Sequence, residues 1–315
     1  MHIQRILPFL RDAGYEPKVW NQYAYEEIDA DIFSTKRPFP FIWWILFLFR
    51  RKAPIVHFHQ FSFFHFPYIF FLSWVCKNKI FITIHNEKLI KTSEIGRRLR
   101  GLLLRMSRRV TVISVSSAVG DLLSGLGVKD VVCLPAYVPP VITKKKKLPT
   151  DVDLKVVFNA WRIGDENDVT VYGVDLLCNL ARIYSSISFY VFVGDISSCY
   201  IGIYIRSKGL RNITVILGES LVDYLEDADF FLRLNREDAY GVSIQEALDL
   251  RVPALASDAC RRPQGCVLFE NGNFLDLVGK FDGMLNTERT ELIKERVITR
   301  HHVDLIELYK SRVGF

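Results

Sequence analysis

The sequence predicts an α/β protein of two doubly wound domains that face each other across a cleft, each a parallel sheet covered by helices. Short apolar runs rich in β-branched residues alternate with helical segments, which is typical of parallel α/β architecture. At 315 residues the chain is long enough for two ordinary domains. Near its middle, PPVITKKKKLPTDVD (139–153) interrupts the alternation with prolines and consecutive lysines, so we expect a solvated connection there.

The first half opens with HIQRILPFLRDAGYEPKVW, which indicates a helix and a following strand within 2–20. Further strands are expected at 54–60, 79–87, 109–116 and 129–137, with helices around 64–76, 94–107 and 117–126. We expect this domain to cover 1–140 and a C-terminal helix, about 298–315, to pack back onto it.

After a linker at 141–152, the same rhythm predicts a second domain over 153–297. Its strands are expected at 154–161, 188–195, 212–218, 229–235 and 252–258, and its helices at 173–186, about 221–227 and 243–251, with a helical tail from about 287. Sheets of this kind bind ligands at the carboxyl ends of their strands, so the loops at those ends are where a site is expected.

Composition excludes several classes of protein. Half of the residues are hydrophobic and 24% are charged, which argues against a disordered or fibrous chain. The six cysteines are too few and too scattered for a disulfide framework, and none pair as CxxC. We recognise no signal peptide at the N-terminus and expect a reducing, cytosolic compartment. The dinucleotide fingerprint GxGxxG is absent, which disfavours an oxidoreductase.

Charge and aromatic residues are unevenly distributed. Residues 1–150 hold 23 Lys and Arg against 10 Asp and Glu, so the first half is basic and the second acidic. The run FPFIWWILFLF (39–49) is too short to span a bilayer and has cations on both sides, so we expect it to lie in the interface of an anionic membrane. The alternative is a buried helix with a basic rim. A second run, 61–76, is expected to be mainly core.

The stretch REDAYGVSIQEALDLRVPALASD (236–258) carries the most chemical information. It indicates a loop after a strand, then a helix that begins near Ser243. Gly241 lets the backbone approach a ligand closely, and open N–H groups at Val242, Ser243 and Ile244 would suit a diphosphate. Glu246, one turn in, can accept two hydrogen bonds from a ribose diol. The alternative is a capped helix behind a solvated acidic loop.

These residues resemble the carboxylate–x7–carboxylate motif of retaining GT-B glycosyltransferases, in glycosyltransferase family four. Asp238 and Glu246 stand eight positions apart, with the aromatic-glycine pair Tyr240-Gly241 between them. The run EALDLRVPALASD is similar to the family's E-A-x-x-x-G-x-P-V-x-A-S-D. Two departures are an aspartate at 238, where glutamate is usual and Glu237 is a register alternative, and Arg251 in place of glycine.

Outside this stretch, FNAWRIGDENDVTVYGVDLL (158–177) occupies the place of the family's G-R-x-x-x-x-K-G-x-D phosphate loop. By this resemblance Arg162 would neutralise the departing diphosphate. The family's lysine is replaced by Tyr172 in a longer, acidic loop, which leaves Arg233 or Arg236 as candidates for a second cation. His85 matches a histidine placed beside the transferred sugar; the alternative is a strand-end histidine satisfied by backbone groups.

The resemblance covers nearly the whole chain and implies the GT-B fold, with two Rossmann-like domains and the first N-terminal strand missing. It implies a retaining, metal-independent hexosyltransferase of polysaccharide biosynthesis. The enzyme would move a sugar from a nucleoside-diphosphate sugar to a lipid-linked or membrane-proximal glycan. Glu246 would hold the ribose, Asp238 would contact the sugar, and no cofactor or metal is expected.

The expected partners are a nucleotide sugar, a glycan acceptor and an anionic membrane surface, without nucleic acid. We therefore expect a cytoplasmic protein that is peripheral at the inner face of the membrane. Two other readings stay open: a non-catalytic GT-B relative that binds a nucleotide sugar or a partner protein, and a sugar-nucleotide epimerase with the same fold.

Overall fold

The structure is a computed structural model that describes residues 2–21, 32–34, 54–59, 65–75, 77–85, 94–140, 142, 144–149, 154–238, 240–293 and 300–313. The chain divides into two compact units. Unit 1 comprises Met1–Val138 and Arg300–Phe315, and unit 2 comprises Pro139–Thr299. The linker expected at 141–152 falls within unit 2. The aromatic run 39–49 lies outside the described residues.

Unit 1 is built on a four-stranded parallel sheet in the order β3-β4-β5-β6. The strands are β3 (Ile55–Phe58), β4 (Lys79–Ile84), β5 (Val110–Ser114) and β6 (Val131–Cys133). The helices are α1 (His2–Asp12), α3 (His65–Val75), α4 (Glu94–Met106), α5 (Ser117–Gly125) and α12 (His301–Val313). A separate parallel pair joins β1 (Val19–Asn21) and β2 (Ile32–Ser34). As expected, a helix precedes the first described strand.

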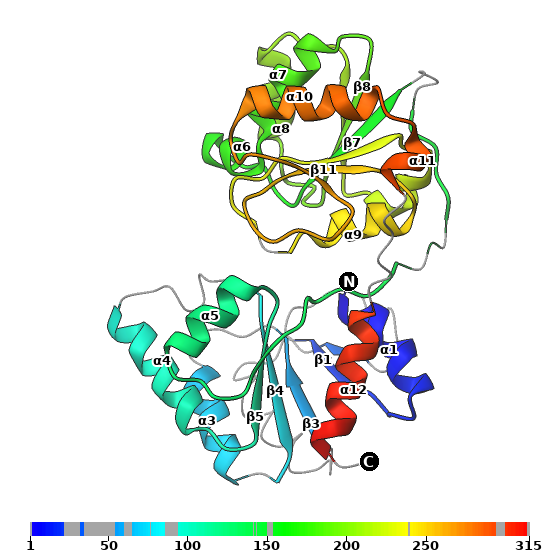
Figure 1. The fold of residues 1–315 in the computed structure, drawn as a ribbon. Helices are drawn as coiled ribbons and strands as arrows, with labels where there is room; N and C mark the ends of the chain where they lie inside the picture. The colour runs from blue at the N-terminus through cyan, green and yellow to red at the C-terminus, as the bar shows by residue number, and fades with distance from the viewer. Residues whose placement is uncertain are drawn as a thin grey trace. The chain divides into compact units, whose positions relative to one another are not determined.

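Alternation along β4 explains why helices cover both faces of this sheet. Ile80 and Ile82 are buried on the face covered by α3, α4 and α5. Phe81 is buried on the other face, against Ile6 of α1 and Tyr309 of α12. Figure 1 shows α3, α4 and α5 on one side of the sheet and α1 and α12 on the other. The C-terminal helix therefore packs onto the unit formed by the first half of the chain.

Unit 2 is built on a six-stranded parallel sheet in the order β12-β11-β10-β7-β8-β9. The strands are β7 (Lys155–Ala160), β8 (Ser188–Val193), β9 (Ile213–Leu217), β10 (Phe230–Arg233), β11 (Ala254–Ser257) and β12 (Val267–Phe269). The helices are α6 (Glu166–Tyr172), α7 (Val174–Ile183), α8 (Tyr200–Ser207), α9 (Val242–Asp249), α10 (Phe274–Leu285) and α11 (Arg289–Leu292), with 3₁₀ turns η2 (Leu221–Asp223) and η3 (Leu225–Asp227). The expected α/β class, with a helix-covered parallel sheet in each unit, is confirmed.

Several local predictions were wrong. The segment after Arg162 was expected to be a long acidic loop, but Asp165 accepts a hydrogen bond from the N–H of Asp168 and thereby caps α6. The helix expected at about 221–227 consists of two 3₁₀ turns. The elements α8, α10 and β12 were not predicted at all, although the apolar residues of α10 follow regular helical spacing.

The lysine run was expected to be solvated, and Lys144, Lys145 and Lys147 are exposed; the run also makes ion pairs at the surface of unit 2. Lys145 pairs with Glu226 at 2.6 Å, and Lys146 pairs with Glu219. Leu148 is buried in the core of unit 2, and its N–H donates to Oδ2 of Asp227 at 2.8 Å. The acidic side chains around η2 and η3 thus hold this basic segment against unit 2.

Candidate functional site

The carboxyl ends of the strands of unit 2 meet at one edge of the sheet, where the topology changes direction. From β7 the chain adds β8 and β9 on one side, and then returns to place β10, β11 and β12 on the other side of β7. Open parallel sheets bind ligands outside the carboxyl ends at such a switch point. In unit 2 the switch point lies between β7 and β10, and α9 starts from the loop that follows β10.

Gly241 determines how α9 begins. It adopts the left-handed conformation with φ 79°, and a Cβ there would lie 2.7 Å from Cδ1 of Ile244. The N–H of Ile244 donates to the carbonyl of Gly241 at 2.9 Å, so the expectation that this group is open was wrong. The N–H groups of Val242 and Ser243 have no acceptor within the described part of the chain. They form an anion-binding position of two amides.

Beside this helix start, Arg233, Asp238 and Arg262 form an ion cluster. Nε and Nη2 of Arg233 donate to the two carboxylate oxygens of Asp238 at 2.8 and 3.0 Å, and Nη1 of Arg262 donates to Oδ2 at 2.6 Å. The side chains of Asp238 and Arg262 are 10% and 1% exposed. Burial alone would raise the pKa of Asp238, but the two guanidinium groups outweigh it and hold that pKa well below its usual range. The three ionised groups carry a net positive charge.

Neutral hydrogen bonds connect this cluster to the sheet and to α9. Nη1 of Arg233 and the hydroxyl of Ser243 both donate to Oδ1 of Asn159, at 3.0 and 3.1 Å. Nε and Nη2 of Arg262 donate to the carbonyl and hydroxyl oxygens of Ser257 at 2.8 and 2.9 Å. The ends of β7, β10 and β11 and the first turn of α9 are therefore held in one network, which is suited to a pre-organised site.

Sequence reasoning missed Asn159 and Arg262. Arg262 is separated from Asp238 by 24 positions, and Asn159 is separated from Arg233 by 74, so no local spacing links these pairs. The one available signal was that each residue lies at or just after the carboxyl end of a strand, where parallel sheets gather their site residues.

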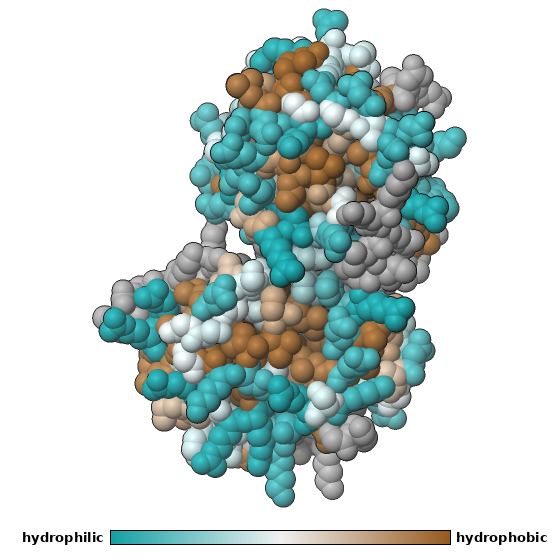
Figure 2. Space-filling view, in the orientation of Figure 1, coloured by the Kyte–Doolittle hydropathy of each residue, from teal (hydrophilic) through white to brown (hydrophobic). Residues whose placement is uncertain are grey.

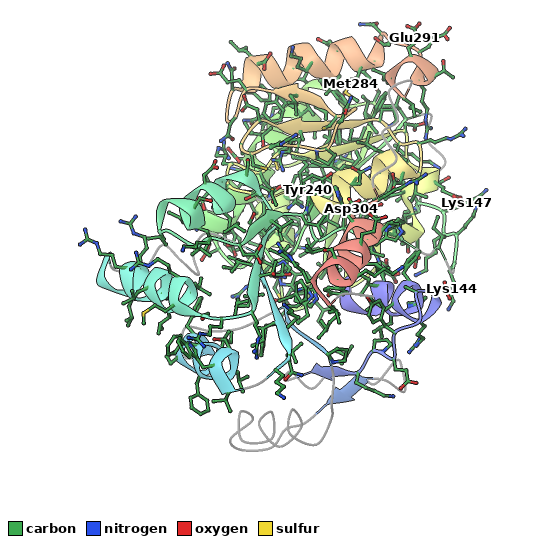
Figure 3. The ribbon with its side chains drawn as sticks, turned by 60° about the horizontal axis from the view of Figure 1, so that its bottom comes forward. Lys144, Lys147, Tyr240, Met284, Glu291 and Asp304 are labelled. Carbon is green, nitrogen blue, oxygen red and sulfur yellow. The ribbon has the colours of Figure 1, made fainter. Side chains whose placement is uncertain are left out.

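The remaining residues predicted near α9 differ in exposure. Glu246 lies one turn into the helix and is 8% exposed. Tyr240 lies in the loop that leads into α9 (Figure 3), and its hydroxyl donates to Oε1 of Gln245 at 3.2 Å. Burial raises the pKa of Tyr240 to about 12, so it stays protonated at neutral pH. Glu237, the register alternative to Asp238, is exposed.

Arg162 lies just beyond β7 on a loop whose backbone is well held. The N–H of Ile163 donates to Oγ of Ser198 at 3.1 Å, and the N–H of Gly164 donates to Oδ2 of Asp168 at 2.8 Å. The guanidinium group is exposed and folds back over Gly164, where an added Cβ would lie 3.1 Å from Nε. It also lowers the pKa of Asp195 at the end of β8, after the hydrogen bonds from Ser197. Arg162 is therefore an exposed cation on a backbone held by hydrogen bonds.

The two candidates for a second phosphate cation have different partners. Arg236 makes two hydrogen bonds to the carboxylate of Asp175, at 2.8 and 2.7 Å, so its charge is matched on α7. Arg233 belongs to the cluster described above. Tyr172, which replaces the family's lysine, is half-buried, and burial raises its pKa although Arg233 opposes that shift. Of the two arginines, Arg233 is the one held beside α9.

His85 belongs to unit 1, whereas the other predicted site residues belong to unit 2. It follows β4 and is partly buried; burial lowers its pKa, and a backbone hydrogen bond with His59 opposes this, so the imidazole is neutral at pH 7. The rings of His57 and His59 lie 3.9 Å apart, as expected for two residues on one face of a strand. Nε2 of His57 is 2.7 Å from the hydroxyl of Thr83, which indicates a structural role for His57.

Among the described residues, no three His, Cys, Asp or Glu side chains are placed to hold a metal ion. None of the helices in the described ranges is long and apolar enough to cross a membrane. At the edge of unit 2, amide and guanidinium groups that can bind an anion lie next to a buried carboxylate in α9.

The sequence matches no family model and no curated protein. Solved structures with the same architecture do match. A glycosyltransferase from Rickettsia africae ESF-5 is 15% identical, with a TM-score of 0.70 over 99% of this chain and 94% of that chain. WaaG, a glycosyltransferase of lipopolysaccharide biosynthesis, is 12% identical, with a TM-score of 0.69 over 98% and 94%. HepE from Anabaena, solved with UDP-glucose, is 13% identical, with a TM-score of 0.61 over 90% and 81%. These likenesses show that the chain has the GT-B fold.

Proposed function

We propose that the protein is a retaining glycosyltransferase that takes a sugar from a nucleoside-diphosphate sugar. The observation that carries this proposal is the pair of open amides at Val242 and Ser243, placed at the switch point of unit 2 beside a cluster of net positive charge. A diphosphate is the anion that such a helix start and cluster would suit. HepE, which shares the fold, was solved with UDP-glucose, and this agrees with a nucleotide donor.

Each site residue has a proposed part. The amides of Val242 and Ser243 bind the diphosphate, and the exposed guanidinium of Arg162 moves onto it as negative charge develops there. Glu246 accepts hydrogen bonds from the ribose diol. Asp238 keeps Arg233 and Arg262 in place beside the sugar, next to exposed Glu237.

The proposed reaction needs no nucleophile from the protein. The acceptor hydroxyl attacks the anomeric carbon on the face from which the diphosphate departs, so the configuration is retained. The bond from that carbon to the diphosphate oxygen breaks, a new bond forms to the acceptor oxygen, and a phosphate oxygen takes the proton. His85, neutral at pH 7, is the proposed hydrogen-bonding partner of the transferred sugar. The positive groups of the site stabilise the leaving group without a metal.

Replacing Glu246 tests the donor site. We expect Glu246→Ala to weaken binding of the nucleotide sugar by at least tenfold, because the ribose loses a charged acceptor. Binding is measured by calorimetry with uridine, guanosine and adenosine diphosphate sugars. Glu307→Ala, at an exposed position of α12 in unit 1, is the matched control. If the wild type binds one of these sugars and Glu246→Ala binds it equally well, this assignment is wrong.

The acceptor is proposed to be a lipid-linked or membrane-proximal glycan, because unit 1 carries an apolar and basic surface on α3 and α4. We call it the α3–α4 surface; its exposed apolar members are Phe71, Trp74, Val75, Leu99, Leu102 and Met106. On α3 they are spaced i, i+3 and i+4, and on α4 i, i+3 and i+7, so each set lies on one face of its helix. Hydrophobic surface shows between charged side chains on the side of unit 1 where α4 lies (Figure 2).

The charges of the α3–α4 surface favour anionic lipid. Arg98 and Arg105 flank the apolar row of α4 and are exposed, and the guanidinium of Arg108 lies 3.6 Å from the centre of the Trp74 ring. The sequence of α3 contains no Asp or Glu, and the one acidic residue in the sequence of α4 is Glu94, its first residue. A surface that combines exposed aromatic side chains with arginines and has few carboxylates suits a layer of anionic headgroups.

A further inference from the structure

Trp161 is a large apolar side chain left in solvent at the edge of unit 2 where the candidate site lies. It follows the carboxyl end of β7, the central strand at the switch point, and is 66% exposed. It precedes Arg162, the proposed diphosphate cation. The resemblance to family four gives it no role, because the family's phosphate loop has glycine at this position.

The indole of Trp161 packs against the backbone of Gly194. A Cβ at Gly194 would lie 2.6 Å from Cε3 and 2.8 Å from Cζ3 of the indole, so the ring lies against the bare backbone at the end of β8. The carbonyl of Trp161 accepts from the N–H of Asp195 at 2.8 Å, and two positions further on the N–H of Ile163 donates to Oγ of Ser198 at 3.1 Å. The backbone at Trp161 is therefore held by hydrogen bonds and the ring rests on Gly194, while most of the ring remains exposed.

The Trp161 ring lies near the path that a nucleotide bound at α9 would follow along the sheet edge. The proposed diphosphate position belongs to α9, which follows β10, on one side of β7. The indole leans toward β8, on the other side of β7, and neighbouring strands are about 4.8 Å apart. A nucleotide with its diphosphate at α9 that extends along the carboxyl edge toward β8 and β9 passes over this ring. Ile196 is also exposed on that side, packed against Gly218.

We propose that Trp161 is the surface on which the base of the donor nucleotide stacks. This inference rests on the proposed function and adds to it the place of the base. An aromatic face stacks on any base, so Trp161 contributes affinity with little preference among bases. Gly194 is the residue that makes room for it.

The test is binding of UDP, GDP, ADP and inorganic pyrophosphate to the wild type, Trp161→Ala and Trp161→Phe. We expect Trp161→Ala to weaken binding of the preferred nucleoside diphosphate by about tenfold or more, and Trp161→Phe to keep most of the affinity. Pyrophosphate, which has no base, should bind all three equally. Nucleotide should quench tryptophan emission in the wild type and in the control Ile203→Ala, and the quenching should be lost in Trp161→Phe although that variant still binds.

The outcomes separate the two proposals. If the wild type binds no nucleoside diphosphate, the proposed function fails and the place of the base fails with it. If the wild type binds one and Trp161→Ala binds it equally well, the function stands and the stacking role is wrong. Equal weakening of pyrophosphate and nucleotide in Trp161→Ala also contradicts stacking, because it indicates damage to the diphosphate position instead.

Discussion

At the residue scale, the candidate site depends on Asp238 being shared by Arg233 and Arg262. Each guanidinium is buried or nearly so, and each has further hydrogen bonds to a neighbouring strand end. The carboxylate therefore does two things: it makes burial of the two arginines tolerable, and it leaves the cluster with a net positive charge beside the open amides of α9. Removing one partner of such a cluster is costly because the others stay buried without compensation.

We expect Asp238→Asn to destabilise unit 2 by about 3–5 kcal/mol at neutral pH. The folded-state pKa of Asp238 is depressed, so its contribution to stability is present above the unfolded value of about 3.9 and is lost as the pH falls below it. Urea unfolding of wild type and variant should therefore show a gap at pH 7 that narrows between pH 4 and pH 3. Glu226→Gln, which breaks a surface pair with Lys145, should change stability by less than about 1 kcal/mol. A gap for Asp238→Asn that is the same at every pH would count against the ion cluster.

At the element scale, α9 is flanked at both ends by residues whose backbone is in the left-handed conformation. Gly241 precedes the helix, and Arg251 follows it with φ 61°. Glycine occupies the position of Arg251 in the family's motif, and this backbone conformation explains why. The arginine tolerates a conformation that is unfavourable for a residue with a Cβ. Its carbonyl accepts a hydrogen bond from Nη2 of Arg289 at 3.1 Å, a contact that the backbone supplies whatever the side chain.

Arg251→Gly should therefore stabilise unit 2. Relief of the left-handed strain stabilises the folded state by about 1–2 kcal/mol. The greater conformational freedom of glycine in the unfolded chain offsets about 0.4–1 kcal/mol of that gain. A rise in Tm of roughly 1–4 °C is expected in calorimetry. Arg251→Ala is the control: it removes the arginine side chain but keeps the Cβ, so no rise is expected. Equal gains in the two variants would attribute the effect to the side chain rather than to φ.

The strands of both units were predictable because buried parallel strands are short apolar runs, and all nine that the sequence indicated outside the opening segment are present. The start of α9 was predictable because Gly241 precedes a helical pattern. The partners of Asp238 were not predictable. Arg262 contacts it across 24 positions of sequence, and nothing in the sequence indicates which of the many arginines pairs with this carboxylate. The acidic segment before Tyr172 was misread because the same aspartates that suit a solvated loop also cap and begin a helix.

At the scale of the whole molecule, the basic first half and the acidic second half have separate uses in this account. In the proposed function, unit 2 binds the donor through a few placed cations and amides although its overall charge is negative. The proposal gives unit 1 the α3–α4 surface for contact with an anionic membrane. The sequence analysis predicted membrane contact by the run 39–49, which lies outside the described residues. It expected 61–76 to be mainly core, whereas α3 buries Phe66, Ile69 and Leu72 and exposes Phe71 and Trp74, at 58% and 46%.

We expect the protein to float with vesicles of phosphatidylglycerol and phosphatidylcholine at low salt, and to be released by about 0.5 M salt because the screening length then falls to a few ångströms. The double variant Arg98→Glu with Arg105→Glu, and separately Trp74→Ser, should bind these vesicles at least fivefold less. Ile203→Ser, which removes an exposed side chain of α8 in unit 2, is the matched control. Full binding by the α4 double variant would exclude the α3–α4 surface as the docking face.

The central claim is that the first turn of α9 binds the diphosphate of a nucleotide, and a crystal structure of the wild type with its preferred nucleoside diphosphate tests it most directly. We expect phosphate oxygens about 3 Å from the N–H groups of Val242 and Ser243, with Arg162 turned toward them. A nucleotide bound with its phosphates away from α9 would contradict the account.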